Sequence, residues 1–295
     1  MAHSKFDTFI LGQISKDINI DYDGTLREEF GGAVIYSGFA AANIGHKVGV
    51  IPKADTNDVD LRKAFAEAKG TTVFPVHSKN STSIKNQYHT ADRERRTCTA
   101  ISVIEPYAVA EIPDVESEIF HVAGLMYGDL GGDIIEYVSK KGKVAVDVQC
   151  MLRCVENGSM VFHDWADKKK YLPLIDFLKT DAAEAQIMTG LEDRAEAAKI
   201  LYSWGAKEIM ITHNTEVLVY DGIKIYTEPL KPLNLSGRTG RGDTCFSGYI
   251  TERITNGIEH SLKFAAALVS LKMGIPGPFK GTRNDVFDFI AKYYE

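Results

Sequence analysis

The 295-residue chain lacks most of the features that mark secreted, membrane-bound or nucleic-acid-binding proteins. It has only four cysteines, and no second Cys or His pair completes a zinc pattern around Cys150 and Cys154. No apolar stretch reaches the roughly 18 residues that span a bilayer, and the opening "MAHSKFDTFILGQ" has too short an apolar run for a signal peptide. A net charge of −6 argues against a generic nucleic-acid binder. We therefore expect a cytoplasmic globular protein with neither nucleic acid nor membrane as a partner.

Two common nucleotide-binding motifs are also missing. A nicotinamide dehydrogenase needs G-x-G-x-x-G after its first strand, and the "GQISKD" that follows the apolar run at 6–12 lacks it. The P-loop pattern G-x-x-x-x-G-K-[ST] is not found anywhere in the chain. The sequence therefore excludes both classes of enzyme.

Apolar strands and amphipathic helices alternate along the chain. This alternation predicts one α/β domain over residues 1–295, with a mostly parallel central sheet and helices on both faces. Ligands in such sheets bind at the carboxyl ends of the strands. The expected strands are 6–12, 48–54, 71–76, 118–124, 143–149, 174–180 and 207–213, with a late hairpin over 216–229. The expected helices are 37–47, 58–70, 132–142, 182–190, 192–205, 242–256, 258–274 and 284–294.

Two further hairpins interrupt this alternation. One has Asp23 and Gly24 at its turn, and the other pairs alternating runs on either side of the charged turn 91–96. We expect these segments, about 17–33 and 81–104, to form a small sheet that covers one end of the main domain as a lid.

The segment "GRTGRGDTCFSGY" at 237–249 carries the most specific chemistry. Gly240 and Gly242 allow a tight turn with unshielded amides, and the apolar pattern after them begins a helix. Amides at the positive end of a helix bind phosphate, and Asp243 beside them suits a general base for an attacking hydroxyl. One plainer interpretation is that Asp243 only favours the first helical turn through the dipole. The "RGD" at 241–243 also matches an adhesion tripeptide, but a three-residue string is nearly uninformative.

This segment resembles the C-terminal signature of the ribokinase-like sugar and nucleoside kinases, the PfkB family, whose usual form is D-T-x-G-A-G-D-x-F. The matching residues are Thr239, Gly240, Gly242, Asp243 and Phe246. The departures are Gly237 for the usual Asp, Arg238 for Thr and Arg241 for Ala. The resemblance implies a three-layer α/β/α sandwich with a small β-sheet lid, in which Asp243 is the catalytic base. The anion hole would be formed by Gly240, Arg241 and Gly242.

Other family motifs follow in the expected order. Gly31 and Gly32 resemble the N-terminal Gly-Gly pair, with Tyr36 replacing the usual Asn, and Asp17 resembles the sugar-binding aspartate of G-x-x-x-x-D. Asp181 and Glu184 stand in for N-x-x-E, which implies a water-mediated Mg²⁺, although the same residues also suit a helix capping box. Thr212 matches the nucleotide strand, where Asn214 replaces a Gly.

The resemblance implies an ATP-dependent kinase that phosphorylates a hydroxyl of a small polyol. Mg²⁺ is the implied metal, a monovalent cation stays open, and the enzyme would be a monomer or a homodimer. The chain looks more similar to the inositol and nucleoside branches than to ribokinase, but a sugar stays open as the acceptor. The alternative is a non-catalytic binding protein on the same fold. The implied substrate residues are Asp17, Gly31, Gly32, Tyr36, Gln149 and Arg153, and the implied nucleotide residues are Thr212, Asn214 and Ser270.

Overall fold

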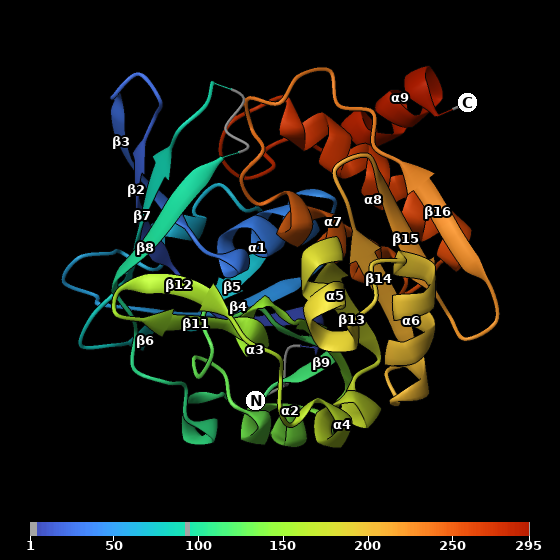
Figure 1. Cartoon of the computed structure of the whole chain (residues 1–295), viewed down its shortest axis with the longest axis horizontal. Helices are drawn as coiled ribbons and strands as arrows, with labels where there is room; N and C mark the ends of the chain where they lie inside the picture. The colour runs from blue at the N-terminus through green and yellow to red at the C-terminus, as the bar shows by residue number, and fades with distance from the viewer. Residues whose placement is uncertain (1–4, 92–94, 295) are drawn as a thin grey trace.

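The protein, described by a computed structural model for residues 5–91 and 95–294, is built around a ten-stranded sheet (Figure 1). The strands run parallel from β14 to β5 and β6, and β15 and β16 add an antiparallel hairpin at one edge. In spatial order they are β16 (Ile225–Pro229), β15 (Glu216–Tyr220), β14 (Glu208–Thr212), β13 (Phe177–Asp181), β10 (Lys143–Asp147), β9 (Glu116–Val122), β1 (Lys5–Gln13), β4 (Val48–Ala54) and β5 (Thr71–Val73), with β6 (Val76–His77) also beside β4. The predicted mostly parallel sheet is confirmed.

Helices cover both faces of this sheet, as predicted. Val144 and Val146 of β10 belong to the core beneath one helical layer, whereas Ala145 between them belongs to the core beneath the other, because successive side chains of a strand point to opposite faces. The first layer has α2 (Gly132–Val138), α5 (Ala182–Thr189) and α6 (Arg194–Ser203), with the short α3 (Gln149–Leu152) and α4 (Lys168–Tyr171) nearby. The second has α1 (Ala33–Asn43), α7 (Arg241–Glu252), α8 (Ile258–Met273) and α9 (Arg283–Tyr293). No helix in the described part of the chain has the length and apolar content to cross a bilayer.

A second sheet of six strands, the small sheet, stands beside the main domain, on the left of Figure 1. Its order is β11 (Arg153–Glu156), β12 (Ser159–Phe162), β8 (Arg96–Ser102), β7 (Thr82–Tyr88), β2 (Ser15–Ile20) and β3 (Leu26–Gly31). It contains both predicted hairpins, although residues 92–94 of the second turn lie outside the described residues. The β11–β12 hairpin was not predicted. Its turn is Asn157–Gly158, and both residues have positive φ, as this type of tight turn requires.

The predicted helix over 58–70 is wrong. The segment forms turns and one short 3₁₀ helix, η1 (Lys63–Phe65), and most of its backbone bonds span three residues rather than four. The Asp60 carboxylate accepts hydrogen bonds from the amides of Arg62 and Lys63, which favours a local turn over a regular helix. Leu61 and Phe65 are still buried, so the apolar pattern reported the burial correctly but not the backbone conformation.

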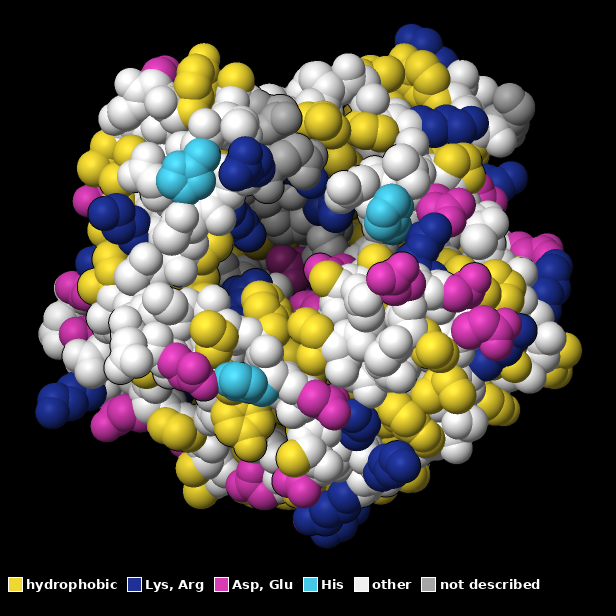
Figure 2. Space-filling model, in the orientation of Figure 1, with side chains coloured by type: hydrophobic (Ala, Val, Ile, Leu, Met, Phe, Trp, Pro, Cys, Tyr) yellow, Lys and Arg dark blue, Asp and Glu magenta, His cyan; other side chains and the backbone are white. Residues whose placement is uncertain are grey.

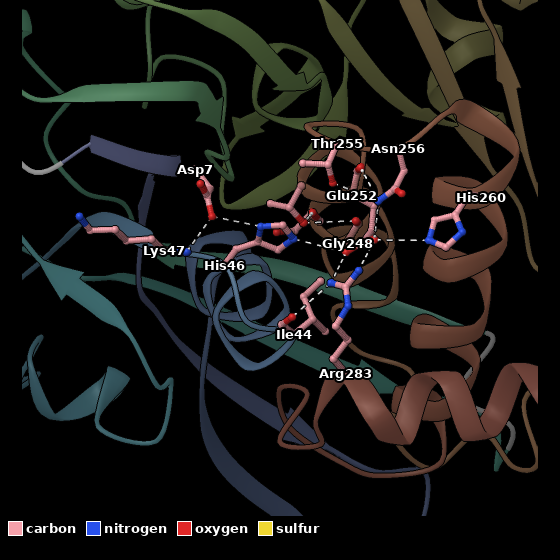
Figure 3. Close-up of polar contacts among 12 residues, drawn as sticks. Asp7, Ile44, His46, Lys47, Gly248, Glu252, Thr255, Asn256, His260 and Arg283 are labelled. Atoms are coloured by element: carbon pink, nitrogen blue, oxygen red, sulfur yellow. Dashed lines mark hydrogen bonds and ion pairs between the residues drawn. The ribbon is translucent and has the colours of Figure 1, made fainter.

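The carboxyl end of α7 is fixed by a buried ionic cluster, shown in Figure 3. The Glu252 side chain is fully buried, and its carboxylate accepts two hydrogen bonds from Arg283, at 2.6 and 2.7 Å. His46, in the loop after α1, lies 3.3 Å from Glu252 and 3.2 Å from Asp7 of β1. Burial alone would raise the pKa of Glu252, but the bonds from His46 and Arg283 hold it below its usual value. The cluster thus ties α7 to α9, the loop after α1 and β1.

Replacing Glu252 with glutamine is expected to lower the free energy of unfolding by about 3 kcal/mol, because Arg283 would lose its buried counter-charge. Urea denaturation measures the change. The matched control is Glu136→Gln, because Glu136 forms an exposed ion pair with Lys170, and such pairs contribute about 1 kcal/mol or less. Equal effects of the two substitutions would show that the Glu252 cluster does not anchor α7.

Candidate active site

A cavity lies between the small sheet and the main domain. Figure 2 shows a hollow in this region, with basic and acidic side chains inside it. This first cavity has a volume of about 420 Å³ and a lining of both polar and apolar side chains. Its polar side chains include Asp17 and Asn19 of β2, Asn86 of β7, Arg96 of β8 and Arg153 of β11. The small sheet therefore supplies carboxylate, amide and guanidinium groups to one side of the cavity, and the main domain supplies the other side.

A second cavity, of about 320 Å³, adjoins the first at the carboxyl ends of β13 and β14. Its lining is dominated by charged side chains and by the backbone of the glycine-rich turn. The residues that line it are Tyr88, Arg96, Gln149, Lys179, Asp181, Thr212, Arg238, Thr239, Gly240, Arg241, Gly242 and Asp243. A cavity with this many cations suits a small polyanion.

The two cavities share one wall, and Asp243 stands in it. Thr239, Gly240 and Asp243 line both cavities. The backbone of Asp243 is held from α1, because the Ser37 hydroxyl donates to its carbonyl oxygen at 3.4 Å. A ligand in either cavity would therefore reach the same carboxylate, which is the geometry needed to transfer a group from one ligand to the other.

The turn before α7 is held in a conformation that only glycine adopts readily. Gly240 is the N-cap of α7, with φ 74° and ψ 16°, and a Cβ there would lie 2.1 Å from the ring of Tyr36. The Lys272 ammonium donates to the carbonyl oxygens of Gly237 and Thr239, which fixes the loop leading into the turn. Burial lowers the pKa of Lys272 to about 8. The predicted Tyr36 therefore contributes at least a packing surface for the turn.

The amides at the start of α7 lie beside the second cavity, where the sequence predicts an anion site. The first N–H groups of a helix have no acceptor within the helix, and Gly242 and Asp243 of this first turn line the second cavity. The Arg241 N–H already donates to the Arg238 carbonyl at 3.3 Å, which competes with its predicted role in the anion hole. The side chain of Arg241 instead lines the second cavity, where its Nη1 donates to Asn214 at 2.9 Å.

Two carboxyl groups of the site are held in unusual electrostatic surroundings. Burial, reinforced by the nearby Asp147 carboxylate, raises the pKa of Asp243 to about 6. Burial also raises the pKa of Asp17 to about 6, and the Ser15 hydroxyl and Arg96 partly oppose this rise. A carboxyl group with its pKa near 6 is mostly ionised at neutral pH and is a stronger proton acceptor than an ordinary aspartate. Both groups are therefore suited to binding and activating a hydroxyl.

Asp181 and Glu184 form the capping box at the start of α5. The Glu184 amide donates to Asp181 at 2.8 Å, and the Asp181 amide donates to Glu184 at 2.7 Å. Asp181 also lines the second cavity, whereas Glu184 is buried behind it. Burial raises the pKa of Glu184 to about 7. Both interpretations of Asp181 made from the sequence are therefore compatible with its position, but Glu184 is set back from the cavity.

The remaining predicted residues divide into three groups. Gly32, Tyr36, Gln149 and Arg153 line the first cavity, and Thr212 lines the second. Gly31 and Asn214 stand just outside: a Cβ on Gly31 would lie 2.5 Å from the Asp17 carboxylate, and the Asn214 side chain bonds Arg241. Ser270 lines neither cavity. It is buried in α8, where its hydroxyl donates to the Ala266 carbonyl and accepts from the Lys231 amide.

Several residues of the site were missed in the sequence. Lys179 of β13 lines the second cavity and forms a buried ion pair with Asp147. Arg96 and Tyr88 of the small sheet line both cavities. A lysine inside the apolar strand "FLKT" was a detectable signal, because charged residues are rarely buried without a specific role. Arg96 carried no such signal, since it belongs to a charged turn that reads as a solvated surface.

Comparison with known proteins places this chain in a family. The model of the pfkB family carbohydrate kinases matches residues 13–279. A cytidine kinase of Thermococcus kodakarensis is 24% identical over 256 residues, which cover 83% of this chain and 87% of that protein.

Solved structures agree with this match. One solved structure is a pyrophosphate-dependent kinase of the ribokinase family, complexed with a pyrophosphate analogue and myo-inositol. It superposes with a TM-score of 0.87 and is 34% identical, and the alignment covers 95% of this chain and 99% of that chain. Ribokinase of Arabidopsis thaliana, complexed with ribose and ATP, shares the fold with a TM-score of 0.75 at 15% identity, with 97% of this chain and 99% of that chain covered. The chain is a kinase and belongs to the PfkB family of carbohydrate kinases.

Proposed function

We propose that this kinase transfers a phosphoryl group to a hydroxyl of a small cyclic polyol bound in the first cavity, with Asp243 as the general base. The observation that carries this proposal is the position of Asp243 in the wall shared by the two cavities. In the proposed reaction Asp243 accepts the hydroxyl proton as the oxygen attacks the terminal phosphorus, and the bond from that phosphorus to the bridging oxygen of the donor breaks. The amides of Gly240 and Gly242 stabilise the charge on the transferring group.

An inositol is the acceptor that the first cavity favours. A carboxylate accepts hydrogen bonds from two neighbouring hydroxyls. Asp17 is half-buried, and its oxygen Oδ1 is buried without a hydrogen-bond partner. Asn19 and Asn86, which bond each other at 3.1 Å, add amide groups for further hydroxyls. A neutral polyol with hydroxyls around its ring matches this mixed set of groups. The 34% identical neighbour that binds myo-inositol supports the same choice.

Pyrophosphate is the donor that the second cavity favours. Lys179, Arg238 and Arg241 line it together with Arg96, and apart from Tyr88 its described lining has no apolar side chain on which an adenine ring could stack. Asn214 replaces the family's usual glycine and bonds both Arg238, at 3.4 Å, and Arg241, at 2.9 Å. Arginine binds phosphate through two hydrogen bonds at once. ATP, expected from the sequence, stays the second candidate because the ribokinase neighbour was solved with ATP.

Mg²⁺ fits the second cavity beside Asp181. This ion prefers oxygen ligands, keeps several waters, and is usually held by one or two carboxylates together with substrate phosphates. The Asp181 carboxylate faces the cavity and would hold the hydrated ion against the donor, where Mg²⁺ neutralises part of the phosphate charge. We further propose that the small sheet, including segments 17–33 and 81–104, closes over the polyol and excludes water that would otherwise compete as acceptor.

A donor-by-acceptor assay tests the proposed function. The purified protein with Mg²⁺ is given pyrophosphate or ATP and a panel of inositols, sugars and nucleosides, and ³¹P NMR follows the products. We expect phosphate release from pyrophosphate that depends on an inositol. The rate of phosphoryl transfer from pyrophosphate should be at least tenfold above the rate of transfer from ATP. Faster transfer from ATP would overturn the pyrophosphate assignment, and transfer to nucleosides or sugars but not inositols would overturn the acceptor assignment.

A further inference from the structure

Lys179 is a charged residue within a strand that is otherwise uncharged until its last position. Strand β13 has the sequence F-L-K-T-D, and Lys179 is only 5% exposed. Its ammonium nitrogen lies 2.9 and 3.1 Å from the two carboxylate oxygens of Asp147. Because a buried ion pair is often no more stable than apolar residues of similar volume, packing alone does not explain a lysine here. The residue therefore indicates a role other than stability.

The ammonium lies on the floor of the second cavity, beneath the first turn of α7. Lys179 lines this cavity, whereas Asp147 and Glu184 do not. A Cβ added to Gly242 would lie 3.3 Å from the Lys179 nitrogen, so a larger residue in the glycine turn would crowd it. The nitrogen therefore stands close to the backbone amides that the proposed mechanism assigns to the transferring phosphoryl group.

The surroundings of Lys179 keep it protonated and leave it able to bind an anion. Both carboxylate oxygens of Asp147 accept hydrogen bonds from the nitrogen, and this pairing favours the charged ammonium form. Glu184 stands 3.8 Å from the nitrogen, too far for a direct hydrogen bond. An ammonium has three N–H donors, and the two oxygens of Asp147 satisfy at most two of them. The third can therefore point into the cavity.

We propose that Lys179 is a catalytic residue of the donor site, whose ammonium contacts the phosphoryl group in transfer, and that Asp147 is the residue that positions it. This inference rests on the proposed function and deepens it. The ammonium acts as a fixed positive charge and does not exchange its proton in the reaction. Asp147 is itself held in place, since it accepts a hydrogen bond from the Gln149 amide at 3.1 Å and is 3% exposed.

The Lys179→Met substitution is expected to lower kcat by about 10²-fold, the usual cost of removing one preorganised donor from a transition state. Binding of imidodiphosphate, a pyrophosphate analogue that resists transfer, is expected to weaken at least tenfold in calorimetric titrations. The KM for the polyol should stay within twofold, because Lys179 does not line the first cavity. A purely structural role would instead lower the melting temperature and alter both substrates alike. Lys207→Met, in an exposed pair with Asp176, is the matched control.

A second variant separates the lost ammonium from the carboxylate left behind. Lys179→Met combined with Asp147→Asn removes both charges, so it leaves no unpaired buried carboxylate to unfold the protein or repel the donor. If our inference is correct, this folded double variant keeps the loss of kcat and of analogue binding. Wild-type values in the double variant would overturn the role of Lys179 but leave the proposed function intact. A parent enzyme that transfers from neither pyrophosphate nor ATP would overturn both.

Discussion

Replacing Asp243 with asparagine is expected to lower kcat by about 10²–10⁴-fold, the range that a positioned general base contributes. Asparagine has nearly the same shape, so the backbone amides of the turn stay in place and donor affinity should change by less than about threefold. Rapid-quench measurement of phosphate release and calorimetric titration of imidodiphosphate give the two quantities. Near-normal kcat in this variant would remove Asp243 as the base and, with it, the proposed mechanism.

The stability of the same variant distinguishes the base from a helix-capping residue. Burial raises the pKa of Asp243 to about 6, so the folded protein binds this proton more tightly than the unfolded chain. The stability that the protonated group provides is therefore present below about pH 4 and is lost as the pH rises through 6. At pH 7.5 the asparagine variant should melt no lower than the parent. A residue that only favoured the helix dipole would give the opposite result, as we expect for Glu196→Gln at the equivalent position of α6.

The pH dependence of the parent enzyme provides a second readout of this prediction. In the proposed mechanism Asp243 must be ionised to accept a proton. Asp17, with its pKa also raised by burial to about 6, must be ionised to accept hydrogen bonds from two hydroxyl groups. We therefore expect kcat/KM to fall below pH 6 with a limiting slope near two on logarithmic axes. The Asp17→Asn variant should be less active, and its kcat/KM should fall at low pH with a slope near one. A parent profile that is flat from pH 5 to 8 would show that neither carboxyl group limits the reaction.

The sequence predicts the backbone part of the site better than the charged part. Gly240, Gly242 and Asp243 are neighbours in the chain, so their spacing alone indicates the turn and its acid. Lys179 and Asp147 are 32 residues apart and meet only because β10 and β13 pair in parallel, so a single sequence does not show the contact. Asn214 and Arg241 are likewise joined only by the fold. Contacts of this kind, between residues distant in the sequence, underlie the proposed donor site.

The fold shows the same division between local and distant information. Alternating strands and helices indicate the three layers, because the buried face of each strand or helix is visible as a hydrophobic pattern within its own short segment. The β11–β12 hairpin had a local signal in Asn157–Gly158, but its short, partly exposed strands do not alternate strongly enough to be recognised. The contribution of this hairpin to the site is visible only in the structure, where Arg153, Met160 and Phe162 line the first cavity.

The Gly240→Ala substitution is expected to lower kcat by about 10²–10³-fold through the backbone alone. A Cβ at this position would lie 2.1 Å from the Tyr36 ring, and Tyr36 is buried in α1, so the turn would have to move away from it. The amides that we propose to hold the transferring group would move with the turn. Stopped-flow or quenched assays of phosphate release measure the loss, and the donor analogue should also bind more weakly.

Gly190→Ala is the control that separates this displacement from backbone strain. Gly190 has φ 78° and ψ 3°, close to the values of Gly240, but a Cβ there would meet no atom within 4 Å. Both substitutions carry the same penalty for a left-handed residue, about 1–2 kcal/mol, and Gly240→Ala adds the cost of the contact with Tyr36. Only Gly240→Ala should lose activity. If both variants stay active, the anion hole does not depend on the close approach of the turn to Tyr36, and the amides of α7 are not the groups that stabilise the transition state.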